Sequence, residues 1–344
     1  MGYSKQVYNK AWQTLENRGA EARARAAARR EEVLKRIPRI TGIQQEMAAG
    51  AAGITRAVIN APARAGDLIE KLAEQNLSLQ QQRSALLLEN GFPPDYLEEQ
   101  FGCPHCRDKG YVGTGMCICL RELLASAAYA ELSAAAPVRS CSFDTFSLDY
   151  YPDAPGPDGK SPRGRMRDIL TVCRSYAASF SPGSESLLLI GQTGLGKTHL
   201  SLAIAEAVIG AGFGVVYTPV QRLLDTLESE KFSYDTQLKE QYAEHLRSAI
   251  TCDLLVLDDL GTEFITQYSN SVLYSIINSR QVEGRPTIIS TNLELAEIES
   301  KYAQRMLSRL VCAYKVLKFT GKDIRFIKKT QPRGSAPEEI TAWK

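Results

Sequence analysis

A glycine-rich segment in the second half of the sequence has the residue types and spacing of a phosphate-binding loop. It fits the pattern G-x-x-x-x-G-K-[ST] and lies between an apolar run and a helical pattern. Glycines let the backbone wrap a phosphate with its N–H groups, and the N-terminus of the following helix adds a partial positive charge. Lys197 is expected to reach the β- and γ-phosphates, and the Thr198 hydroxyl to bind Mg²⁺. The residues expected to hold the nucleotide here are Gly191, Gln192, Thr193, Gly194, Leu195, Gly196, Lys197, Thr198 and His199.

Polar side chains end two further apolar runs. Asp258 and Asp259 follow Leu254-Leu-Val-Leu257, and Asn292 follows Ser290-Thr291. An acid at the carboxyl end of a buried strand lies beside the phosphate loop, so Asp258 is expected to hold Mg²⁺ through water. Asp259 is then placed to orient or deprotonate the attacking water, although it could instead only cap the following turn. Asn292 is a candidate γ-phosphate sensor. Asparagine is also common at the ends of strands simply because it is favoured in turns.

Four of the eight cysteines lie within 17 positions, in the pattern C-x₂-C-x₁₀-C-x-C. They are Cys103, Cys106, Cys117 and Cys119. Two chelating pairs separated by a glycine-rich turn suit tetrahedral Zn²⁺, so the sequence predicts a structural zinc knuckle over residues 101–120. The second pair is tighter than usual, and His105 could replace one thiol if Cys119 points away. Free thiols and a redox or catalytic role are the alternatives.

The elements that would position these residues follow from hydrophobic periodicity. Short apolar runs alternate with helical patterns, which is typical of a parallel sheet covered on both faces. The expected strands are 186–190, 215–219, 253–258, 287–291 and 316–319. The expected helices are 5–36, 67–89, 120–135, 198–209 and a pair within 221–250, whereas residues 43–66 predict no definite element. Proline and glycine between residues 147 and 164 predict an exposed loop or linker.

Charge is unevenly distributed along the 344 residues. The whole chain carries a net charge of only +2, but residues 1–40 carry +6 and residues 301–333 carry +9. The distribution of charge along the chain is therefore more informative than the net charge. Phosphate-rich partners are candidates for the basic residues 301–333. The sequence shows no apolar signal core and no run of the roughly 20 apolar residues that a membrane helix needs. We therefore expect a cytoplasmic protein without membrane contact, whose cysteines favour metal over disulfides.

Several of these motifs occur together in a known family. GQTGLGKTHL, LLVLDDLGTE, the INSR at 277–280, IISTNL, the RMLSRL at 305–310 and the GKDIR at 321–325 together resemble the DnaC/DnaI-type replicative helicase loaders. The IstB-type transposition helpers are their close relatives, and both groups are AAA+ ATPases. The resemblance implies an α/β P-loop fold with a five-stranded parallel sheet in the order 5-1-4-3-2 and no lid domain. It also implies an arginine finger at Arg309, acting on a neighbouring subunit, and a nucleotide contact from Arg325.

The expected domain organisation combines this resemblance with the cysteine cluster. It comprises a helical partner-binding domain (1–136), a linker (137–165), the AAA+ ATPase domain (166–330) and a flexible tail (331–344). We expect an ATPase that uses ATP and Mg²⁺, with slow, switch-like hydrolysis because Asp259 stands where most AAA+ proteins have glutamate.

The function favoured at this point is loading of a replicative hexameric helicase during DNA replication. The N-terminal domain would bind the helicase, while the AAA+ domain would self-assemble and contact single-stranded DNA. DNA contacts are expected from the basic stretch after Arg305 and from residues 221–250, where Phe232 and Tyr234 could stack on bases or simply pack. The alternatives are an IstB-like helper acting on double-stranded DNA and an adaptor organised by ATP binding without important turnover. The long N-terminal extension favours the loader.

Overall fold

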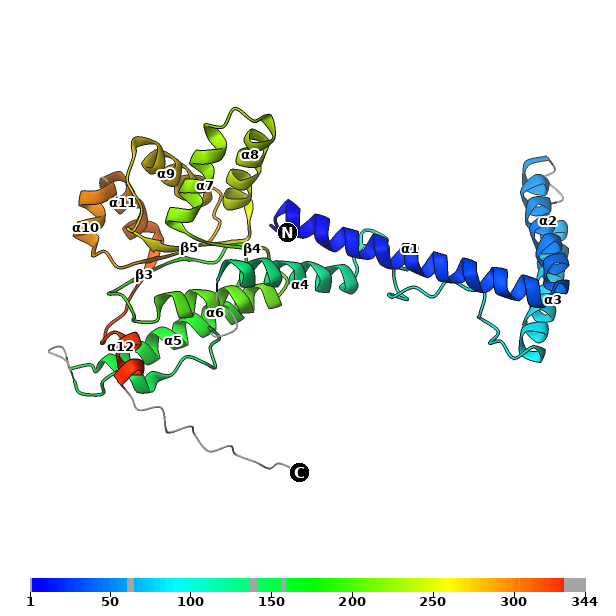
Figure 1. Cartoon of the computed structure of the whole chain (residues 1–344), viewed down its shortest axis with the longest axis horizontal. Helices are drawn as coiled ribbons and strands as arrows, with labels where there is room; N and C mark the ends of the chain where they lie inside the picture. Colours follow the sequence, from blue (N-terminus) through cyan, green and yellow to red (C-terminus); the bar gives the residue numbers. More distant parts are fainter. Residues whose placement is uncertain (1, 61–64, 137–140, 156–158, 303, 331–344) are drawn as a thin grey trace, which may run out of the picture. The chain divides into compact units, whose positions relative to one another are not determined.

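The computed structural model describes the chain except for residues 1, 61–64, 137–140, 156–158, 303 and 331–344 (Figure 1). The described contacts divide it into two compact units. One unit runs from Trp12 to Leu120, and the other joins the residues before Trp12 to those from Arg121 onward. The expected tail, 331–344, lies outside the described residues, as do residues 137–140 and 156–158 of the expected linker.

The unit from Trp12 to Leu120 contains most of three helices and a small cysteine-bearing hairpin. Its elements are α1 (Lys5–Arg36), α2 (Arg39–Asn60), α3 (Ala65–Glu89), β1 (Tyr111–Val112), β2 (Gly115–Met116) and the start of α4 (Ile118–Ala135). A compact apolar cluster joins the end of α1 to the end of α3 and the segment that follows, through Val33, Ile37, Ile40, Leu87, Phe92 and Leu97. Residues 43–60, for which the sequence predicted no definite element, belong to helix α2.

The second unit is built on a five-stranded parallel sheet. Its strands are β3 (Ser186–Ile190), β4 (Val215–Pro219), β5 (Leu254–Leu260), β6 (Thr287–Thr291) and β7 (Tyr314–Lys318). They lie in the order β4-β5-β6-β3-β7, and each neighbouring pair is parallel. Numbered within this sheet and read from β7, the order is 5-1-4-3-2. Beta-branched and leucine side chains fill both faces of the central strands, which explains why these runs read as continuously apolar in the sequence.

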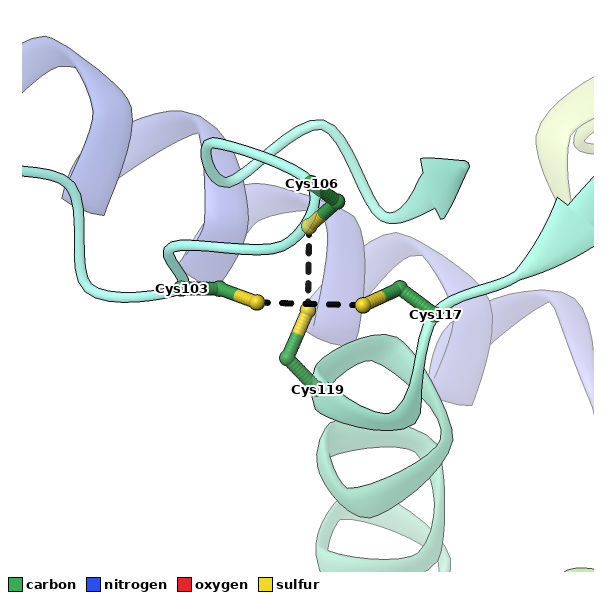
Figure 2. Close-up of side chains that lie close together, drawn as sticks. All are labelled: Cys103, Cys106, Cys117 and Cys119. Atoms are coloured by element: carbon green, nitrogen blue, oxygen red, sulfur yellow. Dashed lines mark hydrogen bonds between the residues drawn. The ribbon is translucent and has the colours of Figure 1, made fainter. Parts of the chain in front are cut away.

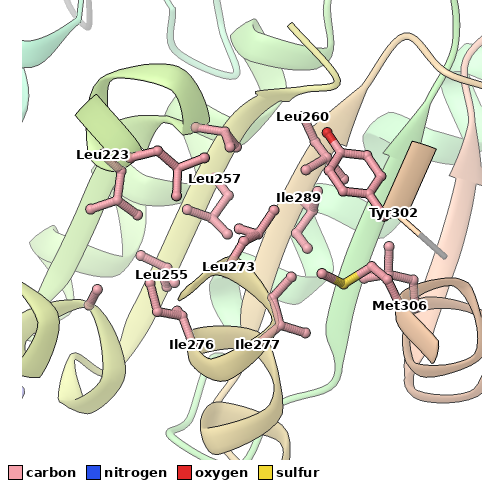
Figure 3. Packing of buried hydrophobic residues seen from close by; sticks show 14 of the residues in the cluster. Leu223, Leu255, Leu257, Leu260, Leu273, Ile276, Ile277, Ile289, Tyr302 and Met306 are labelled. Atoms are coloured by element: carbon pink, nitrogen blue, oxygen red, sulfur yellow. The ribbon is translucent and has the colours of Figure 1, made fainter. Parts of the chain in front are cut away.

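Helices cover both faces of the sheet (Figure 1). One group consists of α5 (Pro162–Ala178), α6 (Lys197–Gly210) and the rest of α4, and short α12 (Ile324–Thr330) follows β7. The opposite group consists of α7 (Val220–Lys231), α8 (Thr236–Thr251), α9 (Gln267–Val282), α10 (Leu295–Tyr302) and α11 (Gln304–Ala313). Figure 3 shows Ile276 and Ile277 of α9 packed over Leu255 of β5 and Ile289 of β6. This core holds β5 and β6 rigidly, and both strands end at the predicted site.

The first residues of the chain and helix α4 belong to the sheet-bearing unit. The Asp253 carboxylate accepts hydrogen bonds from the backbone N–H groups of Gly2, at 2.9 Å, and Gly214, at 2.8 Å. The Ser4 hydroxyl donates to Glu131 of α4 at 3.2 Å. The observed division at residue 120 therefore differs from the expected boundary at residue 136, because α4 packs with the sheet domain. Among the described helices, none combines the length and apolar character needed to cross a bilayer.

Candidate functional site

The predicted phosphate loop connects the end of β3 to the start of α6. Gly191, Gly194 and Gly196 have φ values of 154°, 74° and 85°. A Cβ at Gly194 would lie 1.9 Å from an oxygen of Asp323, and one at Gly196 would lie 2.8 Å from the Phe146 ring. Both the positive φ angles and the close neighbours therefore require glycine at these positions.

The Lys197 side chain turns back into this loop. Its Nζ donates hydrogen bonds to the backbone oxygens of Gly191, at 2.6 Å, and Gln192, at 2.8 Å. The side chain is buried, and this burial lowers the pKa of Lys197, whereas the carboxylates of Asp259 and Asp258 raise it. Among the described residues, this buried ammonium group donates its hydrogen bonds to carbonyl oxygens, and its charge suits it to bind an anion.

The Asp258 carboxylate is the centre of a hydrogen-bond network at the carboxyl end of β5. Its Oδ1 accepts from the Thr198 hydroxyl at 3.1 Å and from the Ser290 hydroxyl at 2.5 Å. Its Oδ2 accepts from the Tyr217 hydroxyl at 2.7 Å. Asp258 and Thr198, which are 60 residues apart in the sequence, are therefore brought together as the pattern predicted. A buried carboxylate beside a hydroxyl offers the oxygen ligands that Mg²⁺ prefers, so these two residues fit the ion.

Asp259 has a left-handed backbone conformation, with φ at 56°. Its N–H donates to the Ser290 hydroxyl at 2.9 Å, and its carbonyl accepts from the Thr262 hydroxyl at 2.9 Å. These two bonds hold the strained backbone in place. Burial and the Asp258 charge raise the pKa of Asp259, whereas Lys197 lowers it. A carboxylate with a raised pKa beside the phosphate loop can accept a proton from water.

A cavity of about 330 Å³ opens beside the phosphate loop. Its wall includes Asp259 and the loop, together with residues that the sequence had placed in a linker. Phe146 and Tyr150 line it from the segment before α5, and the Tyr151 hydroxyl donates to the Leu195 carbonyl at 2.9 Å. Residues 141–155 therefore include one wall of this cavity. Their aromatic rings are a suitable surface for a purine base.

Two predicted nucleotide contacts also line this cavity. Arg325, at the start of α12, lies in its wall near Lys197 and Asp259. The His199 Nε2 lies 2.7 Å from the Ser142 carbonyl and 3.2 Å from the Thr145 hydroxyl. Burial lowers the pKa of His199, so the imidazole is favoured in its neutral form. His199 thus ties the aromatic segment to the phosphate loop.

The remaining two predicted residues lie elsewhere. Asn292 is exposed just beyond β6, and the polar group of this strand that contacts Asp258 is Ser290. Arg309, on α11, donates from Nε and Nη2 to the Tyr274 hydroxyl at 3.0 and 2.8 Å. It lines a separate hollow together with Arg305 and Cys312. Arg309 is not among the residues that line the cavity beside the phosphate loop.

The four clustered cysteines lie together at the hairpin formed by β1 and β2 (Figure 2). The sulfurs of Cys103 and Cys117 are 3.7 Å apart, those of Cys106 and Cys119 are 3.3 Å apart, and all four lie within 4.8 Å of one another. Cys119 points into the group, while the His105 side chain is exposed.

These cysteines fit a tetrahedral metal site. Zinc–sulfur bonds of about 2.3 Å place the sulfurs of a tetrahedron about 3.8 Å apart, which is close to the observed spacing. A backbone hydrogen bond from Cys106 lowers the pKa of Cys103 to about 7, whereas burial and the neighbouring thiols raise the pKa of Cys119. All four thiols could ionise together this close to one another only with a cation to offset their charge.

Asp108 closes the loop that carries the first cysteine pair. Its carboxylate accepts from the backbone N–H groups of Gly102 at 2.8 Å and Cys103 at 2.9 Å. Asp108 itself has a positive φ of 55°, and the side chain is buried. Asp108 is not among the residues predicted from the sequence, although an acid shortly after C-x₂-C could have suggested it.

Comparisons with known proteins concern the second half of the chain. The model of the family described as "IstB-like ATP binding protein" matches residues 167–332. The replicative helicase loader DnaC of Buchnera aphidicola (subsp. Acyrthosiphon pisum) is 26% identical over 171 residues, and DnaC of Escherichia coli K12 is 24% identical over 172 residues. Each alignment covers 50% of this chain and 63% of the relative, so the chain spans less than two thirds of the length of these loaders.

Part of the chain is similar to a solved structure, the crystal structure of the DnaC helicase loader. It superposes with a TM-score of 0.43 and 22% identity, over 54% of this chain and 100% of that chain. Residues 167–332 thus match an IstB-like ATP-binding domain, and this part of the chain is similar to the DnaC-type helicase loaders.

Proposed function

We propose that this protein is an ATPase that loads the replicative hexameric helicase onto DNA. The observation that carries the proposal is the 3.1 Å hydrogen bond between Thr198 and Asp258, together with the buried Lys197 beside them. These three residues form the phosphate- and Mg²⁺-binding geometry of a P-loop enzyme. The IstB-like match over residues 167–332 supports the same reading.

Each residue of the site has a separate role in this proposal. Lys197 and the loop amides bind the phosphates, and Thr198 and Asp258 hold Mg²⁺, which would neutralise the phosphate charge. Asp259 accepts the proton of the attacking water. Asn292 and Arg325 contact the γ-phosphate region, although Asn292 must turn inward from its exposed position to do so.

The position of Arg309 supports self-assembly as part of this proposal. Its guanidinium is held by Tyr274 at a hollow of α9 and α11 and is not in the wall of the chain's own nucleotide cavity. We therefore propose that Arg309 reaches the nucleotide of a neighbouring subunit. The transition state of phosphoryl transfer would then be stabilised only in the assembly.

Single-stranded DNA is the proposed nucleic-acid partner. Tyr234 is fully exposed and Phe232 is 61% exposed, in the turn between α7 and α8. Lys231 lies 5.6 Å from the centre of the Phe232 ring. Exposed aromatic rings beside a basic side chain can stack on bases and attract the phosphate backbone without reading sequence.

The unit from Trp12 to Leu120 is the proposed helicase-binding part, with zinc at its four cysteines. Helix α3 exposes two large apolar side chains, Leu77 at 57% and Leu88 at 59%. An exposed leucine is not in itself unusual, but both lie on one helix outside the ATP-binding match. They are therefore the residues at which we would test a protein contact.

Nucleotide binding tests the ATPase part of the proposal. Lys197→Ala removes the buried ammonium and should abolish binding of a fluorescent ATP analogue. Lys315→Ala, an exposed lysine on β7, is the matched control and should bind as the unchanged chain does. Retained tight binding by Lys197→Ala would refute the phosphate-loop assignment.

Helicase capture tests the loader part. The full chain should retain the hexameric replicative helicase of its host, and the pair Leu77→Ser and Leu88→Ser should weaken this retention. Val282→Ser, at a 78% exposed position on α9, is the control for a general change in surface polarity. No capture by the unchanged chain would contradict the loader function while leaving the ATPase proposal intact.

The IstB-like match also favours a second candidate, a transposition helper that acts on double-stranded DNA. ATP-dependent assembly on a long duplex, without binding to the helicase, would support this alternative. Preference for single-stranded DNA together with helicase capture would support the loader.

A further inference from the structure

Tyr217 lies outside every nucleotide-binding motif of the sequence but contacts the Asp258 carboxylate. It is the third residue of β4, the strand at one edge of the sheet. Its hydroxyl donates to Asp258 Oδ2 at 2.7 Å. We propose that Tyr217 is a positioning residue, which orients the Asp258 carboxylate so that Mg²⁺ contributes fully to nucleotide binding. This inference rests on the proposed ATPase function.

The orientation of the Asp258 side chain is fixed by donors from three different elements. Thr198 of α6 and Ser290 of β6 both donate to Oδ1, whereas Tyr217 of β4 donates to Oδ2. Only 4% of Asp258 is exposed to solvent, so water cannot readily replace a lost donor. Without Tyr217, Oδ2 would be a buried charged oxygen lacking this donor, and the carboxylate would rotate or be displaced to satisfy it.

The strand register explains why a tyrosine serves this purpose. Pro219 pairs with Asp258 in the register between β4 and β5, and proline has no polar side chain to offer. Tyr217 lies two residues earlier and therefore points to the same face of the strand. Its long, rigid ring carries the hydroxyl forward to the carboxyl end of β5, a distance that serine or threonine could not cover.

The Tyr217 hydroxyl is the donor in its hydrogen bond to Asp258. Burial raises its pKa, and the neighbouring Asp258 charge raises it further. An ionised carboxylate can only accept hydrogen bonds, so this contact suits a positioning role. With Oδ2 held by Tyr217, Oδ1 stays beside Thr198, the other residue proposed to hold Mg²⁺.

Loss of the Tyr217 hydroxyl should weaken only the Mg²⁺-dependent part of nucleotide binding. Within the part of the chain that the structure describes, Tyr217 makes no hydrogen bond to the phosphate loop or to Lys197, so it should not affect the binding of ATP without Mg²⁺. Residues that orient metal ligands typically change metal affinity by about 10- to 100-fold when they are replaced. We expect the effect of Tyr217 to lie near the lower limit, because Thr198 and Ser290 still hold Oδ1.

The test measures the affinity of methylanthraniloyl-ATP by fluorescence, once with excess Mg²⁺ and once with EDTA. The ratio of the two affinities is the Mg²⁺ contribution. Tyr217→Phe keeps the ring and removes only the hydroxyl, and it should reduce this ratio by about tenfold. The affinity in EDTA and the melting temperature of the free protein should change little. Tyr314→Phe, a buried tyrosine on the opposite edge strand β7, is the matched control.

A double-mutant cycle separates positioning from a merely structural role. In the Asp258→Asn background, Tyr217→Phe should produce no further loss of the Mg²⁺ contribution, because the carboxylate that it orients is gone. Ser290→Ala, which removes a donor to Oδ1, is a second variant expected to reduce the Mg²⁺ contribution.

Three results would overturn the inference. The first is an unchanged Mg²⁺ contribution in Tyr217→Phe, and the second is an equal loss of affinity in EDTA. The third is an additive loss in the Asp258→Asn background. If the unchanged chain binds no Mg²⁺-nucleotide at all, the proposed function fails, and this inference falls with it. Failure of the proposed function can be told apart from failure of this inference, because nucleotide binding by the unchanged chain is measured first.

Discussion

Removal of metal from the four-cysteine site should unfold the segment from Phe101 to Leu120. The perturbation is a zinc chelator applied to the intact chain, or Cys119→Ser, which removes one ligand. The exposed Cys312 lies outside the group, so Cys312→Ser is the matched control.

The size of the effect follows from how small a core this segment has of its own, although Tyr111 stacks on Trp12 of α1 and Leu120 is buried. Its strands β1 and β2 have only two residues each, and its buried apolar cluster consists of the cysteines themselves. Structural zinc supplies about 10–16 kcal/mol of apparent binding free energy in small zinc modules. This is as large as the stability of an entire domain, at about 5–15 kcal/mol. The Asp108 hydrogen bonds alone, at about 1.5–3 kcal/mol each, cannot replace it.

Metal content and proteolysis measure this effect together. The purified chain should hold about one zinc per four-cysteine site. Trypsin should then cleave after Arg107 and Lys109, which are exposed in the turn, at least about tenfold faster once the metal is removed. Cys119→Ser should behave like the chelated chain. Absence of stoichiometric zinc after purification without chelators, or an unchanged cleavage rate after chelation, would refute the reasoning.

Three further predictions concern the sheet-bearing unit. Arg309→Ala should leave ATP binding intact but slow hydrolysis by about 10³-fold in the assembled state, as measured by phosphate release against protein concentration; normal turnover would remove the finger role. Arg280 of α9 is fully buried and donates to the backbone oxygens of Ala249, Cys252 and Pro286. Arg280→Met should lower the free energy of unfolding in urea by about 3 kcal/mol, because it leaves these buried oxygens without a donor; a loss below about 1 kcal/mol would contradict this. Because burial lowers the pKa of His199 from 6.5, the unfolded chain binds more protons near that pH, and stability should fall as the pH drops from about 7 to about 5. His199→Gln should flatten this part of the pH profile, and an unchanged slope would assign it to other groups.

The sequence predicted best those features that depend on neighbouring residues. The strand before the phosphate loop, the loop glycines and the helix after it are contiguous, so their spacing alone locates them. The expected strands 186–190, 215–219 and 287–291 coincide with β3, β4 and β6. Continuous apolar runs of this kind are characteristic of strands buried on both faces, and tertiary packing reinforces the pattern.

Contacts between distant segments could not be read in the same way. Tyr217 and Ser290 reach Asp258 only because β4 and β6 flank β5, and no local pattern reveals which strand lies beside which. The structure places Asn292 on the surface, since it lies beyond the end of β6. Phe146 was assigned to a proline-rich linker, because composition indicates irregular backbone and not what that backbone packs against.

The buried Arg280 also couples local unfolding at the starts of β5 and β6. Its guanidinium donates to carbonyl oxygens at the end of α8, to Cys252 before β5 and to Pro286 before β6. No part of Arg280 is exposed, so withdrawal of any one segment would leave a charged donor facing a gap. These starts of β5 and β6 should therefore fluctuate as one cooperative unit, with amide protons that exchange together. The carboxyl ends of the same strands carry Asp258 and Ser290, so this single arginine limits how independently the two residues can move.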